Sequence, residues 1–161
     1  MAQLCACRRQ MSAPHLLPAS SSINEDAAVS WDISIMDLPT DAHSVSDIPH
    51  DFAPAPLGKR AALIAKILEI APQADFSDST WGELSTPDFT IEFNMGRDAL
   101  CDSLMLHVRG GDSAVDFITA LLDHLGLRAI DCSKGDFFEP AAAAQSLAAW
   151  RRFRDRVIDG N

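Results

Sequence analysis

No apolar run in the sequence approaches the roughly 18 residues that a membrane-spanning helix needs. The first residues, MAQLCACRRQMSAPHLLPASSS, also lack the unbroken apolar segment of a secretory signal peptide. Hydrophobic residues make up 47% of the 161 residues, which is typical of a globular chain long enough to bury one sizeable core. These features predict one cytoplasmic domain without membrane contact.

Cysteine is scarce, and its spacing matches no redox or metal motif. The four cysteines include no C-x-x-C pair, so no disulfide framework is expected and Cys101 and Cys132 are interpreted as free thiols. The motifs G-x-x-x-x-G-K-[ST], G-x-G-x-x-G, H-E-x-x-H and G-x-S-x-G do not occur either. We therefore expect no cofactor and no metal, and the sequence favours a protein that is not an enzyme.

Positive charge is in short supply. There are 13 Lys and Arg residues against 23 Asp and Glu residues, for a net charge of −10. The excess of carboxylates lies within residues 29–149, because the N-terminal segment is neutral and the last residues are basic. Such a field repels a nucleic-acid backbone and attracts a basic protein partner. Nucleic-acid binding is therefore not expected.

The remaining patterns predict a single α+β domain over residues 29–158. Residues 1–28 are rich in Ala, Ser and Pro and have no periodicity, which predicts a disordered N-terminal extension. The expected strands are 31–38, 82–84, 89–95, 104–109 and 127–131, and the expected helices are 57–71, 114–125 and 141–157. This order predicts a ferredoxin-like split βαβ sandwich, with an antiparallel sheet, two helices on one face and a C-terminal helix.

Two neighbouring strands fix the expected register of the sheet. Residues 89–95 and 104–109 each alternate apolar and polar side chains, and the connection between them is short enough for antiparallel pairing. Pairing that places both apolar sets on one face puts Glu92 opposite His107 and Thr90 opposite Arg109. The opposite face is then polar, and it is either open or covered by helix 141–157.

Glu92 and His107 are the candidate catalytic residues of this polar face. A carboxylate beside an imidazole fixes its tautomer and raises its pKa, as general acid–base catalysis requires. Cross-strand charge pairs also occur simply because they fix register. The sequence favours this structural interpretation, so no catalytic residue is assigned in the leading hypothesis.

Asn94, Arg109, Gly110 and Gly111 are the candidate binding residues. The Arg109 guanidinium could hold a carboxylate or phosphate. The two glycines precede the helix expected from residue 114, and a helix N-terminus presents free N–H groups to an anion. A tight strand-to-helix turn explains the same glycines without any ligand.

The segment between the first strand and the first helix is a long acidic loop. It contains Asp41, His43, Asp47, His50 and Asp51, but these residues lack the regular spacing that preorganises metal ligands. A solvated loop is the favoured interpretation. Loops of this length often carry function.

Several stretches of the sequence resemble a group of small bacterial proteins to which no activity is assigned. They are WDISIMDLP, DIPHDFAPAPLG, ADFSDSTWG, PDFTIEFNMG, LMLHVRGG and LGLRAIDCSKGDFF. The likeness covers about residues 29–138 and implies no catalytic residue. In size and charge the chain also resembles immunity proteins that neutralise toxins, which implies a protein partner.

The leading hypothesis is a non-enzymatic, acidic, cytoplasmic binding module, with an immunity-type inhibitor of a basic protein as one form of it. The alternative is a small enzyme or anionic-ligand-binding domain that uses the polar face with Glu92, His107 and Arg109. The sequence leaves the identity of the partner and the oligomeric state open.

Overall fold

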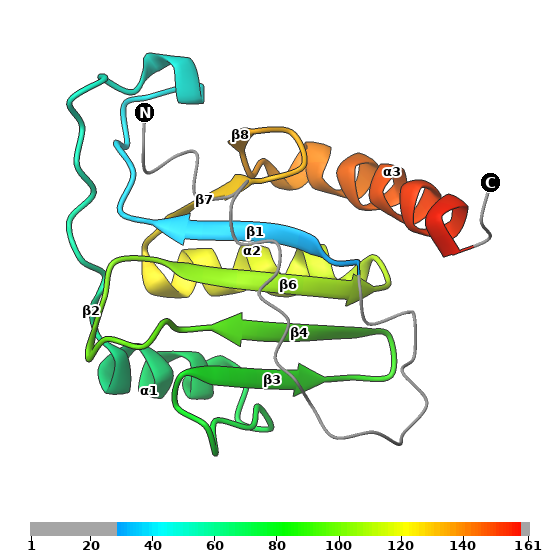
Figure 1. Cartoon of the computed structure of the whole chain (residues 1–161), viewed down its shortest axis with the longest axis horizontal. Coiled ribbons are helices and arrows are strands. Elements are labelled where there is room, and N and C mark those ends of the chain that lie inside the picture. Colours follow the sequence, from blue (N-terminus) through cyan, green and yellow to red (C-terminus); the bar gives the residue numbers. More distant parts are fainter. Residues whose placement is uncertain (1–28, 159–161) are drawn as a thin grey trace.

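One antiparallel sheet organises the chain (Figure 1). The structure is a computed structural model that describes residues 29–158, and the extension expected at 1–28 lies outside the described residues. The strand order is β3-β4-β6-β1-β7-β8, with every neighbouring pair antiparallel. The strands are β1 Trp31–Met36, β3 Trp81–Ser85, β4 Phe89–Asn94, β6 Leu104–Gly110, β7 Arg128–Asp131 and β8 Asp136–Phe137. A separate two-stranded sheet pairs β2 Gly58–Lys59 with β5 Leu100–Cys101.

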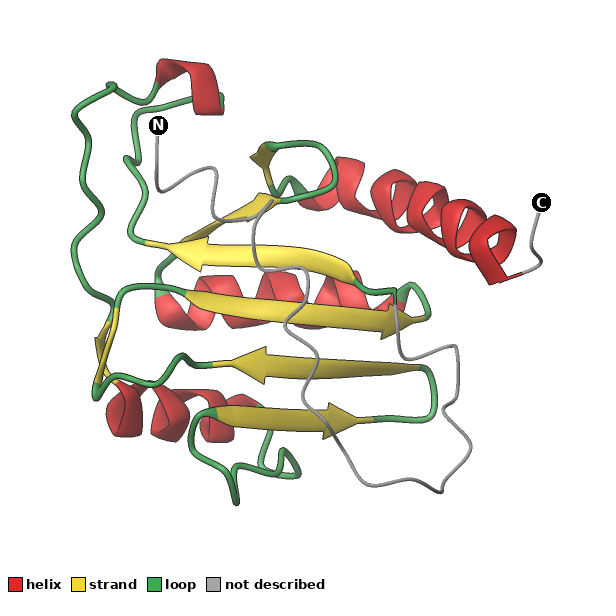
Figure 2. Cartoon of the chain, viewed as in Figure 1, coloured by secondary structure: helices red, strands yellow, loops and turns green. Residues whose placement is uncertain are grey.

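The helices α1 Arg60–Ile70, α2 Ser113–Leu125 and α3 Pro140–Ile158 complete the fold (Figure 2). In Figure 1, α2 lies behind β1 and β6, α1 lies behind the sheet near β3, and α3 follows the edge formed by β7 and β8. Within residues 29–158, no helix is long and apolar enough to cross a membrane. The predicted α+β class, antiparallel sheet and C-terminal helix are confirmed.

Apolar side chains facing the helices hold these layers together. In β4 and β6 the buried residues alternate with half-buried ones, as the alternating sequence predicts. Ile91, Phe93, Leu106 and Val108 are fully buried in this way and pack in one core with residues of the helices. The predicted register is confirmed, because Glu92 lies opposite His107 and Thr90 opposite Arg109.

The C-terminal helix α3 does not cover the polar side of the sheet. Its residues Ala143, Leu147 and Trp150 join the main core instead, and α3 contacts α2. The Trp150 indole and the other apolar side chains of this helix therefore extend the helical layer on the apolar side. Within the described residues, the polar side of β4 and β6 has no helix over it (Figure 1).

Some local features differ from the predictions. Sequence patterns did not predict β2, β5 and β8, because strands of two residues are too short to show alternation. Cys101 is a buried free thiol, as expected. Cys132 is disulfide-bonded, which corrects the interpretation of it as a free thiol. A C-x-x-C motif involves only cysteines that are close in sequence, so its absence does not exclude such a bond.

Candidate functional site

His107 contacts a carboxylate on the polar side of the sheet, but the carboxylate belongs to Asp32 and not to Glu92. Asp32 lies opposite His107 on β1, and its Oδ1 is 2.8 Å from the imidazole Nδ1. The Ser30 hydroxyl donates to the same Oδ1 at 2.6 Å. Trp81 of β3 stacks on the imidazole, with ring centroids 5.4 Å apart and planes 17° from parallel. Among the described residues, none is bonded to the imidazole Nε2.

Glu92 forms an ion pair with Arg109 instead. Its Oε1 is 3.1 Å from Nη1 of Arg109, and about a quarter of each side chain is exposed. The predicted contact between Glu92 and His107 is thus replaced by two pairs, because β1 supplies a second carboxylate from the other side of β6. Partly exposed ion pairs of this kind contribute about 1 kcal/mol or less to stability.

The predicted binding residues are only partly brought together. Asn94 Oδ1 accepts a hydrogen bond from the Gly96 N–H at 3.2 Å, at the end of β4 away from Arg109. Arg109 and Gly110 do share a cavity of about 420 Å³. The cavity is also lined by Thr86, Pro87, Asp88, Phe89, Thr90, Trp150 and Arg154.

The start of α2 already has a carboxylate partner. Asp88, in the turn between β3 and β4, accepts hydrogen bonds from the backbone N–H and the hydroxyl of Ser113. Its backbone carbonyl also accepts the Gly111 N–H at 2.7 Å. A carboxylate at this position caps the helix and favours its dipole. Gly111 is therefore not part of the site that we propose below, since Asp88 occupies the place of an anion.

The acidic loop, residues 37–57 between β1 and β2, folds onto the part of the sheet next to β7 and β8. Ile130 and Phe137 pair with each other on this side of the sheet, and Leu38, Ala42 and Ile48 of the loop pack on them as a second, smaller core. This cover explains why Ser34 of β1, which lies opposite Ile130 in the sheet, is only 6% exposed.

Polar contacts fix the acidic loop in place. The Arg128 guanidinium donates to the carbonyl oxygens of Pro39 and Ala42 and lies 3.8 Å from the centroid of the Phe137 ring. Asp136 Oδ1 accepts the Val45 N–H at 3.0 Å. These contacts join the loop to β7 and β8, so it has a defined conformation despite its length.

Replacing Arg128 by alanine should release the acidic loop while the sheet stays folded. The variant loses two partly buried hydrogen bonds to backbone carbonyls and one cation–π contact, which together are worth roughly 2–4 kcal/mol. Hydrogen–deuterium exchange of residues 37–52 should accelerate strongly, whereas exchange in β4 and β6 should not change. Arg97→Ala, at an exposed position between β4 and β5, is the matched control. Equal exchange of residues 37–52 in the two variants would contradict this role of Arg128.

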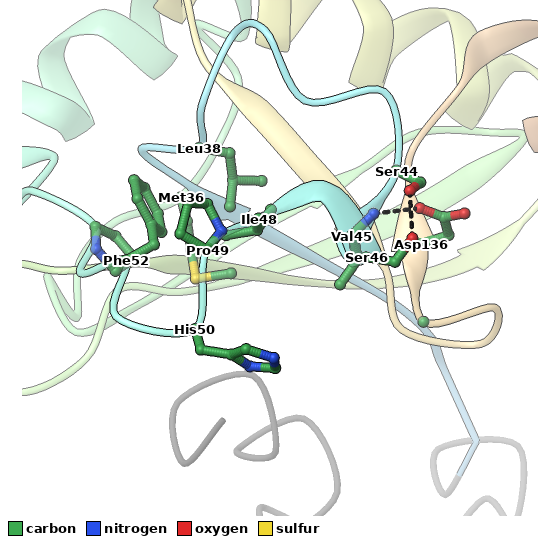
Figure 3. A pocket seen from close by; sticks show the side chains of 12 residues that line it. Met36, Leu38, Ser44, Val45, Ser46, Ile48, Pro49, His50, Phe52 and Asp136 are labelled. Atoms are coloured by element: carbon green, nitrogen blue, oxygen red, sulfur yellow. Dashed lines mark hydrogen bonds between the residues drawn. The ribbon is translucent and has the colours of Figure 1, made fainter.

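A pocket of about 670 Å³ lies beneath the acidic loop (Figure 3). Figure 3 shows Met36, Pro49 and Phe52 gathered at one end, and Ser44, Ser46 and Asp136 at the other. The full lining is Met36, Leu38, Ser44, Val45, Ser46, Ile48, Pro49, His50, Phe52, Pro54, Gly135 and Asp136. We call this cavity the loop pocket. Sequence analysis did not predict it, although apolar residues spaced through a polar loop were a usable signal.

The acidic loop carries Asp37, Asp41, Asp47 and Asp51, all exposed, and no Lys or Arg. Hydrogen bonds from the backbone N–H groups of Ser44 and His43 lower the pKa of Asp47, which keeps this carboxylate charged. Within residues 29–158, no group of three or more His, Cys, Asp and Glu residues is placed to hold a metal ion. Because all four aspartates are exposed, the negative charge of the loop faces the solvent.

Comparison with known proteins adds no assignment. No family model, no curated protein and no solved structure matches the chain.

Proposed function

We propose that this protein is an acidic binding module of the cytoplasm whose partner is a basic protein, as in immunity-type inhibition. The observation that carries the proposal is the acidic loop, which holds four exposed aspartates in a fixed conformation beside the loop pocket. Fixed surface charges steer an oppositely charged partner and select against partners of like charge. The absence of known catalytic motifs from the sequence agrees with a role in binding.

We also propose a ferredoxin-like assignment for the central part of the fold. The strands around α1 and α2 follow the order β7-β1-β6-β4, in which the first and third strands of the split βαβ unit are central neighbours. In this assignment β3 and β8 are additions at the two edges of the sheet. The resemblance to small bacterial proteins, described above, extends over the same residues.

Reversing the charge of two aspartates in the acidic loop should abolish binding of the partner. Asp41 and Asp51 are exposed and accept no described hydrogen bond, so Asp41→Lys with Asp51→Lys changes charge without disturbing the loop. The control, Asp98→Lys with Asp123→Lys, makes the same change in net charge elsewhere on the surface. Affinity capture from the source cells, quantified by mass spectrometry, should retain a basic protein on the wild type and the control but not on the loop variant. Recovery of the wild type only as a monomer without a partner, under all conditions, would count against the proposal.

A second candidate function is binding of a small anion, with or without acid–base chemistry, on the polar side of the sheet. Two observations favour it. The bond to Asp32 fixes the His107 imidazole through Nδ1, which is the arrangement that positions Nε2 to exchange a proton with a substrate. Arg109 and Arg154 also line one cavity together with the hydroxyl-bearing Thr86 and Thr90.

Thermal-shift measurements with a panel of anionic metabolites test this second candidate. A ligand of the polar side should raise the melting temperature of the wild type, and His107→Ala or Arg109→Ala should reduce that rise by more than half. Lys66→Ala, on the exposed side of α1, is the control and should leave the rise unchanged. If both variants respond like the control to every anion, the polar side is a structural surface only.

A further inference from the structure

The loop pocket differs from a site for a polar small molecule, because three of its four polar side chains, those of Ser44, Ser46 and Asp136, already form hydrogen bonds within the protein. The Ser44 and Ser46 hydroxyl groups are 2.7 Å apart and bonded to each other. Asp136 Oδ1 accepts the N–H groups of Val45 and of its own neighbour Phe137. The side chains that remain as walls are mostly apolar. The pocket therefore offers dispersion contacts and area burial more than directed hydrogen bonds.

The size of the loop pocket fits the large side chains of a protein partner. Its volume of about 670 Å³ lies in the range of roughly 300–1,000 Å³ that holds ligands in proteins. Anchor residues at protein interfaces are large apolar or aromatic side chains that fill such preformed pockets. Because Arg128 and Asp136 hold the loop in place, little conformational entropy is lost when the pocket is filled.

The charges around the loop pocket select the sequence on either side of an anchor. Asp47 and Asp51 are chain neighbours of the lining residues Ser46, Ile48 and His50, and Asp136 itself lines the pocket. From residue 32 to residue 58 the chain contains no Lys or Arg. A segment entering the pocket thus meets carboxylates at its rim, which attract Lys and Arg and repel Asp and Glu.

We infer that the loop pocket receives one or two large apolar side chains of a partner segment, flanked by Lys or Arg residues that meet the aspartates of the acidic loop. This inference rests on the proposed function, because it names the place where a basic partner binds and the chemistry of the bound segment. The anchor and the charges contribute differently to binding. The apolar anchor supplies affinity, whereas the charges supply selectivity and increase the rate of association.

A short peptide is a sufficient probe of this inference. The probe is the hexapeptide KKWLKK, with KKSSKK and EEWLEE as controls, titrated into the ¹⁵N-labelled full chain and followed by NMR. Shift changes should concentrate at Val45, Ile48 and Phe52. Both control peptides should bind at least about tenfold more weakly, because one lacks the anchor and the other meets repulsion.

Ser46→Trp blocks the pocket without touching the core. Ser46 is exposed and lines the pocket, so a large side chain there should occupy its volume. This variant should bind KKWLKK at least about tenfold more weakly than the wild type, whereas Ser46→Ala should bind it within about twofold. Circular dichroism of both variants should match the wild type, which separates blocking from unfolding.

Each other outcome overturns the inference. Equal binding of KKWLKK and KKSSKK shows that no anchor enters the pocket, and equal binding of EEWLEE shows that the rim does not select charge. A neutral apolar molecule retained in the wild type and seen by native mass spectrometry identifies a small ligand as the occupant. Concentration-dependent dimerisation lost in Ser46→Trp identifies a second copy of the chain. If Ser46→Trp still captures the native partner while the Asp41 and Asp51 variant does not, the proposed function stands without the pocket.

Discussion

Replacing Gly110 by alanine is expected to destabilise the protein by about 2–6 kcal/mol. Gly110 ends β6 with a φ of 116°, a conformation that side chains strongly disfavour. A Cβ at this position would lie 2.4 Å from the carbonyl oxygen of Asp88 and 2.7 Å from Cα of Phe89. Both are backbone atoms of the paired segment at the start of β4, so they can move only if β4 and β6 separate. Backbone strain contributes about 1–3 kcal/mol to this loss, and overpacking contributes about 1–3 kcal/mol more. The sum is a large part of a typical free energy of unfolding, which is about 5–15 kcal/mol.

Gly96 provides the control for this prediction. It also has a positive φ, of 72°, but a Cβ there would meet no atom within 4 Å. Gly96→Ala should therefore lower the free energy of unfolding only by the cost of a side chain at positive φ, about 1–2 kcal/mol. Urea denaturation followed by far-ultraviolet circular dichroism measures both variants. Equal losses in Gly110→Ala and Gly96→Ala would contradict the close approach of the turn between β3 and β4 to the end of β6.

Replacing Asp131 by alanine is expected to destabilise the protein by roughly 3 kcal/mol. Asp131 is 2% exposed at the end of β7, and its Oδ1 accepts the indole N–H of Trp31 at 3.0 Å. The same oxygen accepts the backbone N–H and the hydroxyl of Ser133, at 2.9 Å and 2.5 Å. Without this carboxylate, a fully buried Trp31 has an indole N–H that lacks an acceptor in the core, which is costly.

Asp131→Asn is the matched control, because the amide oxygen can accept the same three hydrogen bonds. In the same urea titration, Asp131→Asn should lose less than half as much free energy of unfolding as Asp131→Ala. The alanine variant should also weaken the turn between β7 and β8, and so loosen the contact of Asp136 with the acidic loop. Losses of equal size in the two variants would show that the hydrogen bonds of Asp131 contribute little.

Regular periodicity made the centre of the fold predictable from the sequence. Strands β4 and β6 alternate so consistently that only one register buries both apolar sets, and the structure has that register. Helix α2 is bounded in the same clear way by Gly126, whose φ of 65° ends the helix. Local patterns of this kind need no knowledge of distant residues.

Contacts between segments distant in the sequence were not predictable in the same way. The partner of His107 is Asp32, on a strand 75 positions away, and only the order of strands in the sheet brings them together. Asp88 likewise reaches Ser113 from a turn that no motif connects with α2. The loop pocket depends on Arg128 and Phe137 of the late strands β7 and β8. Periodicity within one segment contains no information about such pairs.

The polar side of the sheet has two halves that differ in what covers them. The half next to β7 and β8 is covered by the acidic loop and holds the loop pocket. The half over β4 and β6 carries the pairs Asp32–His107 and Glu92–Arg109. In the proposed function the partner binds at the half that the acidic loop covers.

The affinity of the purified basic partner for the two charge variants tests the central claim most directly. Measured by titration calorimetry at two salt concentrations, the variant Asp41→Lys with Asp51→Lys should bind at least about tenfold more weakly than wild type. The variant Asp98→Lys with Asp123→Lys should stay within about twofold of wild type. Equal weakening of both variants would contradict a specific role of the acidic loop and would leave only general attraction between opposite net charges.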